Sequence, residues 1–310
     1  MHKTPENLPL VYHPDYEMDI GNHVFSTAKY RLALDLLRHD GYALAESIRQ
    51  PQPASREELL TVLTAGMLAD LDHLQWTART IFSELPLSEG IVRGFKLMTG
   101  GTILATRLAL EQGLAVHVGG GFHHGFADHA EGFCYINDIA VAIRVAQREG
   151  LIRRAAVIDV DLHQGNGTAH IFLHDPDVLT FSIHQEMLYP VEKQRSDIDI
   201  GLERFIGDEA YLRQLGSVVP RRIAEHRPEL VVYVAGADPF EEDQLGDLRL
   251  TMEGLRRRDR LVAEAARAEG WPLVAVLAGG YARNPRDTAR IHANMAIELA
   301  GAFGIEPRPS

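Results

Sequence analysis

Two acidic residues and a histidine alternate in the segment that follows the apolar run Ala155–Ile158. If that run is a buried strand, Asp159, Asp161 and His163 project from the same face of its extension. Desolvating two carboxylates and an imidazole in one place is unfavourable without a partner, and a divalent cation is the simplest partner. An Asp and a His two positions apart suit zinc, which accepts oxygen and nitrogen ligands. The alternative interpretation is a cluster of turn-forming, helix-capping Asp residues beside a structural histidine.

A third metal ligand is expected from Asp238, which follows the apolar run Leu230–Ala235. A lone Asp before Pro239 usually caps a turn, so the position after a buried strand is what makes it a candidate. Together with Asp161 and His163 it would complete a three-ligand set that leaves one zinc position open for water. Zinc in such a site acidifies the bound water and polarises a carbonyl group.

Two adjacent histidines, His123 and His124, follow three glycines after the apolar run Leu114–Val118. Neighbouring side chains cannot share one strand face, but in a turn both imidazoles can reach the same substrate. A hydrolase needs a base to take the water proton and an acid to protonate the leaving amine. We expect Asp159 to hold one imidazole and Asn166 the other, which gives the rings different proton affinities. A solvent-exposed His-His turn is the alternative, and the choice of base and acid stays open.

A tyrosine follows a glycine pair in Gly279-Gly280-Tyr281, directly after the apolar run Leu273–Ala278. Its hydroxyl could stabilise a tetrahedral oxyanion, although a tyrosine after a turn is more often a packing residue. Reactive residues thus follow four separate apolar runs. In an open parallel sheet the ligand crevice lies beyond the carboxyl ends of the strands. We therefore expect all of these side chains to meet in one site.

The strand-like runs are mostly continuous apolar stretches, which is typical of strands buried on both faces of a parallel sheet. Helix-like segments alternate with them, as βαβ crossovers require. There is no internal repeat or Gly/Ser linker, so we predict one α/β domain over residues 1–310, with an open, mostly parallel sheet flanked by helices. The predicted strands are Leu8–His13, Leu114–Val118, Ala155–Asp161, Val178–His184, Leu230–Ala235 and Leu273–Ala278. The predicted helices are Thr102–Gln112, Ile136–Glu149, Asp208–His226, Thr251–Ala268 and Asp287–Phe303, with a further helical region from Ala54 to Leu85.

The composition is that of an ordinary globular chain, with 310 residues, 45% hydrophobic and 24% charged. The net charge of -12 argues against direct nucleic-acid binding, which needs clustered Lys and Arg, and is compatible with a cationic substrate. The single cysteine, Cys134, excludes an intramolecular disulfide and fits a reducing, cytoplasmic compartment. No run of about 18 apolar residues occurs, so we predict no membrane span.

Five segments carry a resemblance to a known family, and their joint occurrence in this order is highly specific. They are GGGFHHGFADHAEGFCYINDIAVAI (119–143), VIDVDLHQGNGTAHIF (157–172), FSIHQ (181–185), VVYVAGADPFEEDQLG (231–246) and LAGGYA (277–282). The chain resembles the histone deacetylase family, which includes acetylpolyamine amidohydrolases and acetoin-utilization proteins. The run DQLGDLRLTMEGLRRRDRLV and Gln164 look closest to the class IV-like branch and its bacterial relatives.

The resemblance implies an arginase/deacetylase-like fold and a deacylase with one Zn2+ per chain, which removes an acetyl or longer acyl group from the side-chain amine of lysine in a protein or peptide. By motif position, the zinc ligands would be Asp161, His163 and Asp238. The catalytic residues would be His123 and His124, with Asp159 and Asn166 behind them, and Tyr281. The substrate tunnel would be lined by Gly132, Phe133, Tyr189 and Leu245. The family also commonly holds K+, whose ligands here would be Asp159, Asp161, His163, Ser182 and Ile183.

The chain departs from the family at a rim loop that often carries an acidic residue to grip the substrate backbone. The corresponding segment, Leu63–Leu68, has no acid, which is compatible with a small or unusual acylated substrate. Three alternatives stay open: a deacylase of acetylpolyamines or other small amides, a ureohydrolase with two manganese ions, and a catalytically silent module that binds acylated ligands. The ureohydrolase is disfavoured, because a His-His turn stands where it needs further acidic ligands. An oligomer is compatible with the sequence.

Overall fold

A single parallel sheet runs through the computed structural model of the chain, which describes residues 5–308. Within that range the sheet has eight strands in the order β2-β1-β3-β8-β7-β4-β5-β6, and each pair of neighbours is parallel. The predicted open, parallel sheet flanked by helices is confirmed. The strands are β1 Leu10–Val11, β2 Ile48–Arg49, β3 Leu114–His117, β4 Ala155–Asp159, β5 Val178–Gln185, β6 Ile198–Leu202, β7 Leu230–Val234 and β8 Leu273–Val276.

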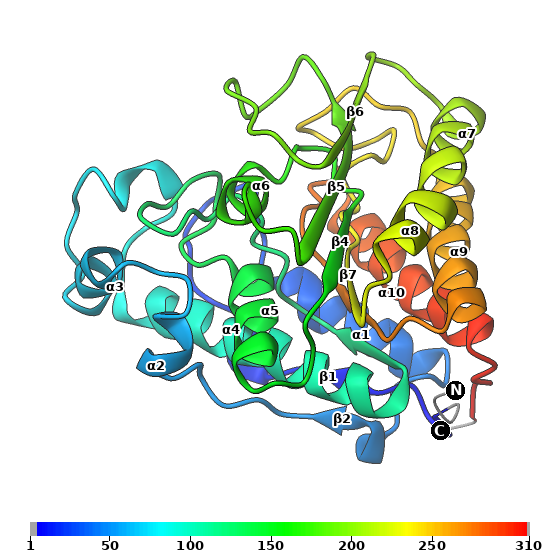
Figure 1. Cartoon of the computed structure of the whole chain (residues 1–310), viewed down its shortest axis with the longest axis horizontal. Helices are drawn as coiled ribbons and strands as arrows, with labels where there is room; N and C mark the ends of the chain where they lie inside the picture. The colour runs from blue at the N-terminus through cyan, green and yellow to red at the C-terminus, as the bar shows by residue number, and fades with distance from the viewer. Residues whose placement is uncertain (1–4, 309–310) are drawn as a thin grey trace.

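Helices cover both faces of the sheet, as Figure 1 shows, with α4 and α5 on one side of the central strands and α1, α9 and α10 on the other. Among residues 5–308, no helix has both the length and the apolar character that crossing a bilayer requires. The helices are α1 Ala28–His39, α2 Arg56–Leu59, α3 Ala65–Asp72, α4 Glu89–Gln112, α5 Asp138–Arg148, α6 Asn166–Phe172, α7 Asp208–Val218, α8 Ala224–His226, α9 Met252–Glu269 and α10 Pro285–Ala302.

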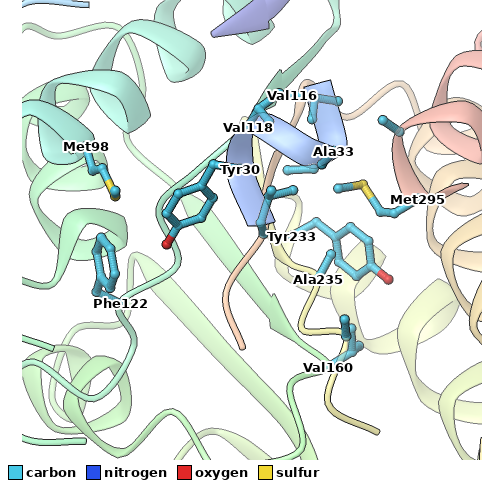
Figure 2. Packing of buried hydrophobic residues seen from close by; sticks show 14 of the residues in the cluster. Tyr30, Ala33, Met98, Val116, Val118, Phe122, Val160, Tyr233, Ala235 and Met295 are labelled. Carbon is cyan, nitrogen blue, oxygen red and sulfur yellow. The ribbon is translucent and has the colours of Figure 1, made fainter. Parts of the chain in front are cut away.

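The core lies in two layers, one on each face of the sheet. Successive strand residues face opposite layers, so Val157 packs on the α4–α5 side and Ile158 on the side of α1 and α10. Figure 2 shows the second layer, where Tyr30 of α1 and Met295 of α10 lie near Tyr233 of β7. Burying one such side chain contributes about 1.5–3 kcal/mol, so the continuous apolar runs hold the sheet between its helices.

Several elements differ from the prediction. The edge strands β2 and β6 were not predicted, because β2 has only two residues and β6 alternates partly buried and exposed positions. The helices α1 and α6 were also not predicted, and α4 begins at Glu89 rather than Thr102. The region from Ala54 to Leu85, predicted to be helical, contains the short helices α2 and α3 and a 3-10 turn, and the rest of it is irregular. The predicted helix over Asp208–His226 is interrupted by a π-helical turn that contains Pro220.

Candidate functional site

Four strands deliver polar side chains to the carboxyl edge of the sheet, where a cavity of about 210 Å³ opens. The loop after β3 carries His123 and His124, and the loops after β4, β7 and β8 carry Asp161, Asp238 and Tyr281 respectively. This is the edge at which ligands bind in open parallel sheets. The cavity is lined by Phe25, Glu84, Gly121, Phe122, His123, His124, Gly132, Phe133, Cys134, Asp161, His163, Leu188, Tyr189, Leu245, Ala278, Gly279 and Tyr281.

The floor of the cavity holds a buried group of potential metal ligands. One ligand atom each from Asp161, His163 and Asp238 lies within 4.8 Å of the others. His163 Nδ1 is 3.2 Å from Asp161 Oδ1 and 3.2 Å from Asp238 Oδ2. Two buried carboxylates this close repel each other unless a cation lies between them, and the Asp2His donor set is one that zinc accepts. The residues present therefore fit a zinc ion.

Backbone groups hold the two carboxylates in place and leave one oxygen of each near the histidine. Asp161 Oδ2 accepts a hydrogen bond of 2.9 Å from Gly279 N–H, and Asp238 Oδ1 accepts one of 3.0 Å from Leu162 N–H. Glycine is required beside them, because a Cβ atom on Gly279 would come within 2.2 Å of Asp238 Oδ2. The Gly-Gly pair before Tyr281 thus shapes the metal-binding region as well as ending the strand.

Each of the two adjacent histidines has a separate buried partner. His123 Nδ1 is 2.7 Å from Asp159 Oδ2, and His124 Nδ1 is 2.7 Å from Asn166 Oδ1. The ring centroids are 4.1 Å apart, so the pair forms one unit at the cavity wall. Because both Nδ1 atoms are engaged, Nε2 of each ring is the nitrogen left for exchange of a proton with a ligand.

The two partners give the rings opposite proton affinities. Burial lowers the pKa of His123, but the carboxylates of Asp159 and Asp161 outweigh it and raise the pKa to about 9. Burial and the neighbouring imidazoles of His123 and His163 hold the pKa of His124 well below its usual value. A divalent cation at the floor of the cavity would lower both values, because it repels a second positive charge.

The loop that carries the histidines is held by the N-terminal end of α5. The Asp138 carboxylate accepts hydrogen bonds from the backbone N–H groups of Gly121 and Phe122, at 3.0 Å and 2.7 Å. Asn137 donates to Gly125 O at 3.0 Å and caps the helix at Ala140 N. The sequence analysis did not identify these two residues, although they stand together in the segment that carries the family resemblance.

Tyr281 also lines the cavity and is buried among aromatic rings. Its ring centroid is 5.9 Å from that of Phe133 and 5.5 Å from Lys29 Nζ. Burial raises the pKa of the Tyr281 hydroxyl well above its usual value, and Asp238 and Asp161 raise it further. The hydroxyl therefore stays protonated and can donate a hydrogen bond.

The residues predicted for the tunnel, namely Gly132, Phe133, Tyr189 and Leu245, all line the cavity. The segment Leu63–Leu68, which was expected to form a rim loop, is not an open loop. Leu63, Met67 and Leu68 are buried around the start of α3. An acidic side chain does stand at the cavity, but it is the exposed Glu84, which the sequence analysis did not identify. It follows a short 3-10 turn and adopts a positive φ of 63°, which no sequence pattern indicates.

The residues named for potassium lie at the ends of adjacent strands. The register of β4 and β5 places Asp159 opposite Ser182, and Ile183 follows in β5. Asp159 Oδ1 accepts a hydrogen bond from Asp161 N–H, and Ser182 Oγ is 2.9 Å from His184 Nδ1. Oxygen atoms from β4 and β5 therefore lie beside the segment that carries the candidate metal ligands Asp161 and His163.

Fold and site together define a class, namely a metal-dependent amidohydrolase built on an open parallel α/β sheet. Comparison with known proteins identifies the family: residues 23–297 match the histone deacetylase domain, and the chain belongs to the histone deacetylase family. Members of this family are hydrolases that act on amides, generally depend on zinc, and use acetylated lysine or polyamine substrates.

Three relatives illustrate the range of the family. Histone deacetylase 2 of Arabidopsis thaliana is 32% identical over 97% of this chain and 80% of its own length. The acetoin utilization protein AcuC of Bacillus subtilis is 31% identical over 96% of this chain and 82% of its own. The histone deacetylase-like amidohydrolase of Pseudomonas aeruginosa is 31% identical over 84% of this chain and 72% of its own. Similar identities to proteins with different names leave the substrate to be argued from the site.

Proposed function

We propose that this protein is a zinc-dependent deacylase that removes an acyl group from the side-chain amine of lysine in a protein or peptide. The observation that carries the proposal is the meeting of three kinds of group in one cavity. The two histidines and Tyr281 line the same small space as Asp161 and His163 of the Asp-His-Asp cluster. Each is a component that hydrolysis of an unactivated amide requires.

The zinc ion would be held by Asp161, His163 and Asp238. When bound, it supplies Lewis-acid chemistry, which polarises the acyl carbonyl and makes water a better nucleophile at neutral pH. The protein contributes the fixed orientation of the two carboxylates, through the N–H groups of Leu162 and Gly279.

The histidine pair would move the protons. One ring takes a proton from the attacking water at Nε2, and a protonated ring gives one to the leaving amine. Asp159 and Asn166 hold Nδ1 of His123 and His124 respectively, so both Nε2 atoms keep a fixed direction. Because a carboxylate supports one ring and a neutral amide the other, the two rings differ in basicity.

Tyr281 would donate a hydrogen bond from its hydroxyl to the carbonyl oxygen, which becomes negative when the carbonyl carbon becomes tetrahedral. It lines the same cavity as the two histidines, so one bound acyl group could contact all three side chains. The aromatic rings of Phe133 and Tyr189, with Leu245, would enclose the alkyl stem of an acyl-lysine. Burial of the methylene groups of the stem against these apolar walls is favourable, because it removes apolar surface from water.

A potassium ion would be held near the zinc ligands by Asp159, Asp161, His163, Ser182 and Ile183. Some of these residues would contribute main-chain oxygens, which suit a hard monovalent cation. The ion would offset the negative charge of the carboxylates at the ends of β4 and β5.

The test is a substrate panel on purified, zinc-loaded protein, which compares acetyl-lysine peptides, longer acyl-lysine peptides and acetylspermidine. We expect turnover of an acyl-lysine peptide, loss of activity with a strong chelator, and recovery on addition of zinc. Tyr281→Phe should lower kcat by roughly two to three decades, the range for removal of one oxyanion donor. Activity that is indifferent to chelation, or a Tyr281→Phe variant with normal turnover, would contradict the scheme.

A second candidate is a deacylase of acetylated polyamines, and Glu84 favours it. Its carboxylate stands at the cavity, where it would attract the cationic amines of a polyamine chain. Preference for acetylspermidine over every peptide, lost in Glu84→Gln, would identify this reaction. Tight binding of an acyl-lysine peptide without any turnover would instead indicate a silent binding module.

A further inference from the structure

A half-buried carboxylate, Glu131, lies behind the His124 dyad, on the far side of Asn166. Its Oε1 accepts hydrogen bonds of 3.1 Å from Asn166 Nδ2 and 2.9 Å from the Tyr189 hydroxyl. Burial raises the pKa of Glu131, but hydrogen bonds from His129, Tyr189 and Asn166 outweigh it and lower the pKa overall. A line of hydrogen bonds therefore runs from an ionised carboxylate through a buried amide to the His124 ring.

The orientation of the Asn166 amide decides which nitrogen of a neutral His124 carries the proton. With Oδ1 toward the ring, the amide accepts from Nδ1–H and leaves the lone pair on Nε2, at the cavity. With the amide reversed, Nδ2 would donate to Nδ1, and the proton would move to Nε2. The ring alone cannot enforce one orientation, because it offers a donor or an acceptor equally well.

Glu131 removes this freedom because an ionised carboxylate only accepts hydrogen bonds. The end of the amide that faces Glu131 must be the NH2 group, so Oδ1 must face His124. We propose that Glu131 is a positioning residue which, through Asn166, keeps His124 in the tautomer with its proton on Nδ1 and its lone pair on Nε2. The inference rests on the proposed function, and it assigns a purpose to a side chain that does not line the cavity.

The structure also contains a simpler use for Glu131, and the experiment must separate the two. Its backbone pairs with Cys134 across the turn that carries Gly132 and Phe133, and its carboxylate holds the hydroxyl of the wall residue Tyr189. A residue that only held this wall would affect substrate binding. A residue that sets the His124 tautomer affects proton transfer, and its importance depends on an amide being present at position 166.

The kinetic test is a double-mutant cycle of Glu131→Gln and Asn166→Asp, assayed with the best acyl-lysine peptide. Gln can present either an oxygen or an NH2 group to Asn166, so Glu131→Gln leaves the amide free to turn. We expect kcat to fall about ten-fold and KM to change less than about two-fold. The fall in kcat is a part of the rate enhancement of about 10²–10⁴ that general acid-base catalysis as a whole supplies. In Asn166→Asp the new carboxylate accepts a hydrogen bond from His124 in either orientation. It also faces the Glu131 carboxylate, so the two negative charges repel each other and the activity of the variant should fall. The double variant removes that repulsion and does not depend on the orientation of an amide at position 166. Its kcat should therefore exceed that of both single variants.

The inference would be overturned if the fold loss of kcat in the double variant equalled the product of the fold losses in the two single variants. A rise in KM with unchanged kcat in Glu131→Gln would also overturn it, and would assign Glu131 to the wall. Glu57→Gln is the matched control, because it makes the same change at an exposed carboxylate of α2 that pairs with Arg148 on the surface, and we expect it to be neutral. All variants are compared at equal zinc content and by thermal melting, so that misfolding is recognised.

A spectroscopic measurement tests the tautomer without any catalysis. Nitrogen NMR of ¹⁵N-histidine protein, with the His124 signals assigned by their loss in His124→Gln, should show a protonated Nδ1 and an unprotonated Nε2. Glu131→Gln should shift these signals toward a mixture of tautomers. Unchanged signals in that variant would refute the role of Glu131. Failure of the wild-type protein to hydrolyse any acyl substrate would refute the proposed function instead, since the NMR result does not depend on turnover.

Discussion

At Gly132, both the backbone conformation and the packing against His124 and Tyr189 require a glycine. It adopts φ +51°, and a Cβ atom there would lie 2.6 Å from His124 Cδ2 and 2.9 Å from Tyr189 Cε1. We expect Gly132→Ala to destabilise the fold by about 1–2 kcal/mol through the left-handed backbone alone. Displacement of the His124 ring should additionally lower kcat/KM by about two decades, since misplacement by about 1 Å has an effect of that size. Urea unfolding and steady-state kinetics measure the two effects separately.

Gly150 provides the matched control for that variant. It also has a positive φ, +69°, but nothing lies within 4 Å of its Cβ position, at the end of α5. Gly150→Ala should therefore show the same loss of stability with unchanged kinetics. Equal kinetic losses in the two variants would mean that destabilisation, and not contact with His124, lowers the activity of Gly132→Ala.

Some functional side chains could be predicted from the sequence, and others could not. Asp161, His163 and Asp238 each follow an apolar run, so the rule that strand ends form the crevice locates them. Glu131 and Asp138 act through hydrogen bonds to residues far away in the chain, as in the contact between Glu131 and Asn166. No local pattern marks such a contact, because it depends on how two loops meet after folding.

Among the elements, helix α9 contacts the loop that carries the candidate metal ligand Asp238 through one buried arginine. Arg258 Nη1 donates to Gly236 O at 2.7 Å, two residues before Asp238, and Arg258 Nε donates to Asp259 Oδ1 at 2.9 Å. Asp259 also accepts from the Tyr233 hydroxyl of β7. The hydrogen bonds to Gly236 and from Tyr233 thus join the helix to β7 and its end, and the Arg258–Asp259 ion pair within α9 that makes them is fully buried.

Breaking this ion pair should destabilise the whole protein. Arg258→Met keeps the volume of the side chain but leaves Asp259 buried and unpaired, so we expect the free energy of unfolding to fall by about 3–5 kcal/mol. Zinc affinity should fall as well, because the Gly236 carbonyl loses its donor. Urea unfolding and zinc titration measure these effects.

The neighbouring Arg257 is the natural control for Arg258→Met. It is partly exposed and pairs with Glu209 on the surface, so Arg257→Met should leave stability and zinc affinity nearly unchanged. Restoration of stability by adding Asp259→Asn to Arg258→Met would confirm that the unpaired carboxylate is the cause. If Arg258→Met were as stable as the wild type, the pair would have no part in holding the loops.

The same distinction between local and tertiary signals applies to the elements. The strands β3, β4, β5, β7 and β8 were predicted because each is a mostly apolar run, and all five lie in the middle of the sheet. The strand β6 was not, because Asp199 interrupts its pattern, and its carboxylate instead accepts from Gln164 and Ser196. The region from Ala54 to Leu85 was predicted to be helical, but after α3 it is largely irregular and is held by side-chain contacts such as the Asp70–Arg79 ion pair.

At the scale of the whole molecule, the site combines negative charge with burial. Asp159, Asp161 and Asp238 are all nearly inaccessible to solvent, and they lie in a chain whose net charge is already -12. Buried like charges oppose folding unless a cation or hydrogen bonds compensate them. Metal binding and folding stability should therefore be linked in this protein.

We expect one zinc ion per chain, and we expect it to stabilise the fold. Within residues 5–308, one group of three buried potential ligands is present, whereas a ureohydrolase centre needs acidic ligands for two manganese ions. A ligand that binds only the folded state stabilises it by about 4 kcal/mol at a free concentration near 1,000 Kd, so the melting temperature should rise with added zinc. Metal analysis after gel filtration and thermal melting over a zinc series measure both quantities. Asp238→Asn should abolish the shift, while Asp35→Asn, which changes an exposed carboxylate on α1, should retain it. Two metal ions per chain, or melting that is indifferent to zinc, would contradict a mononuclear zinc site.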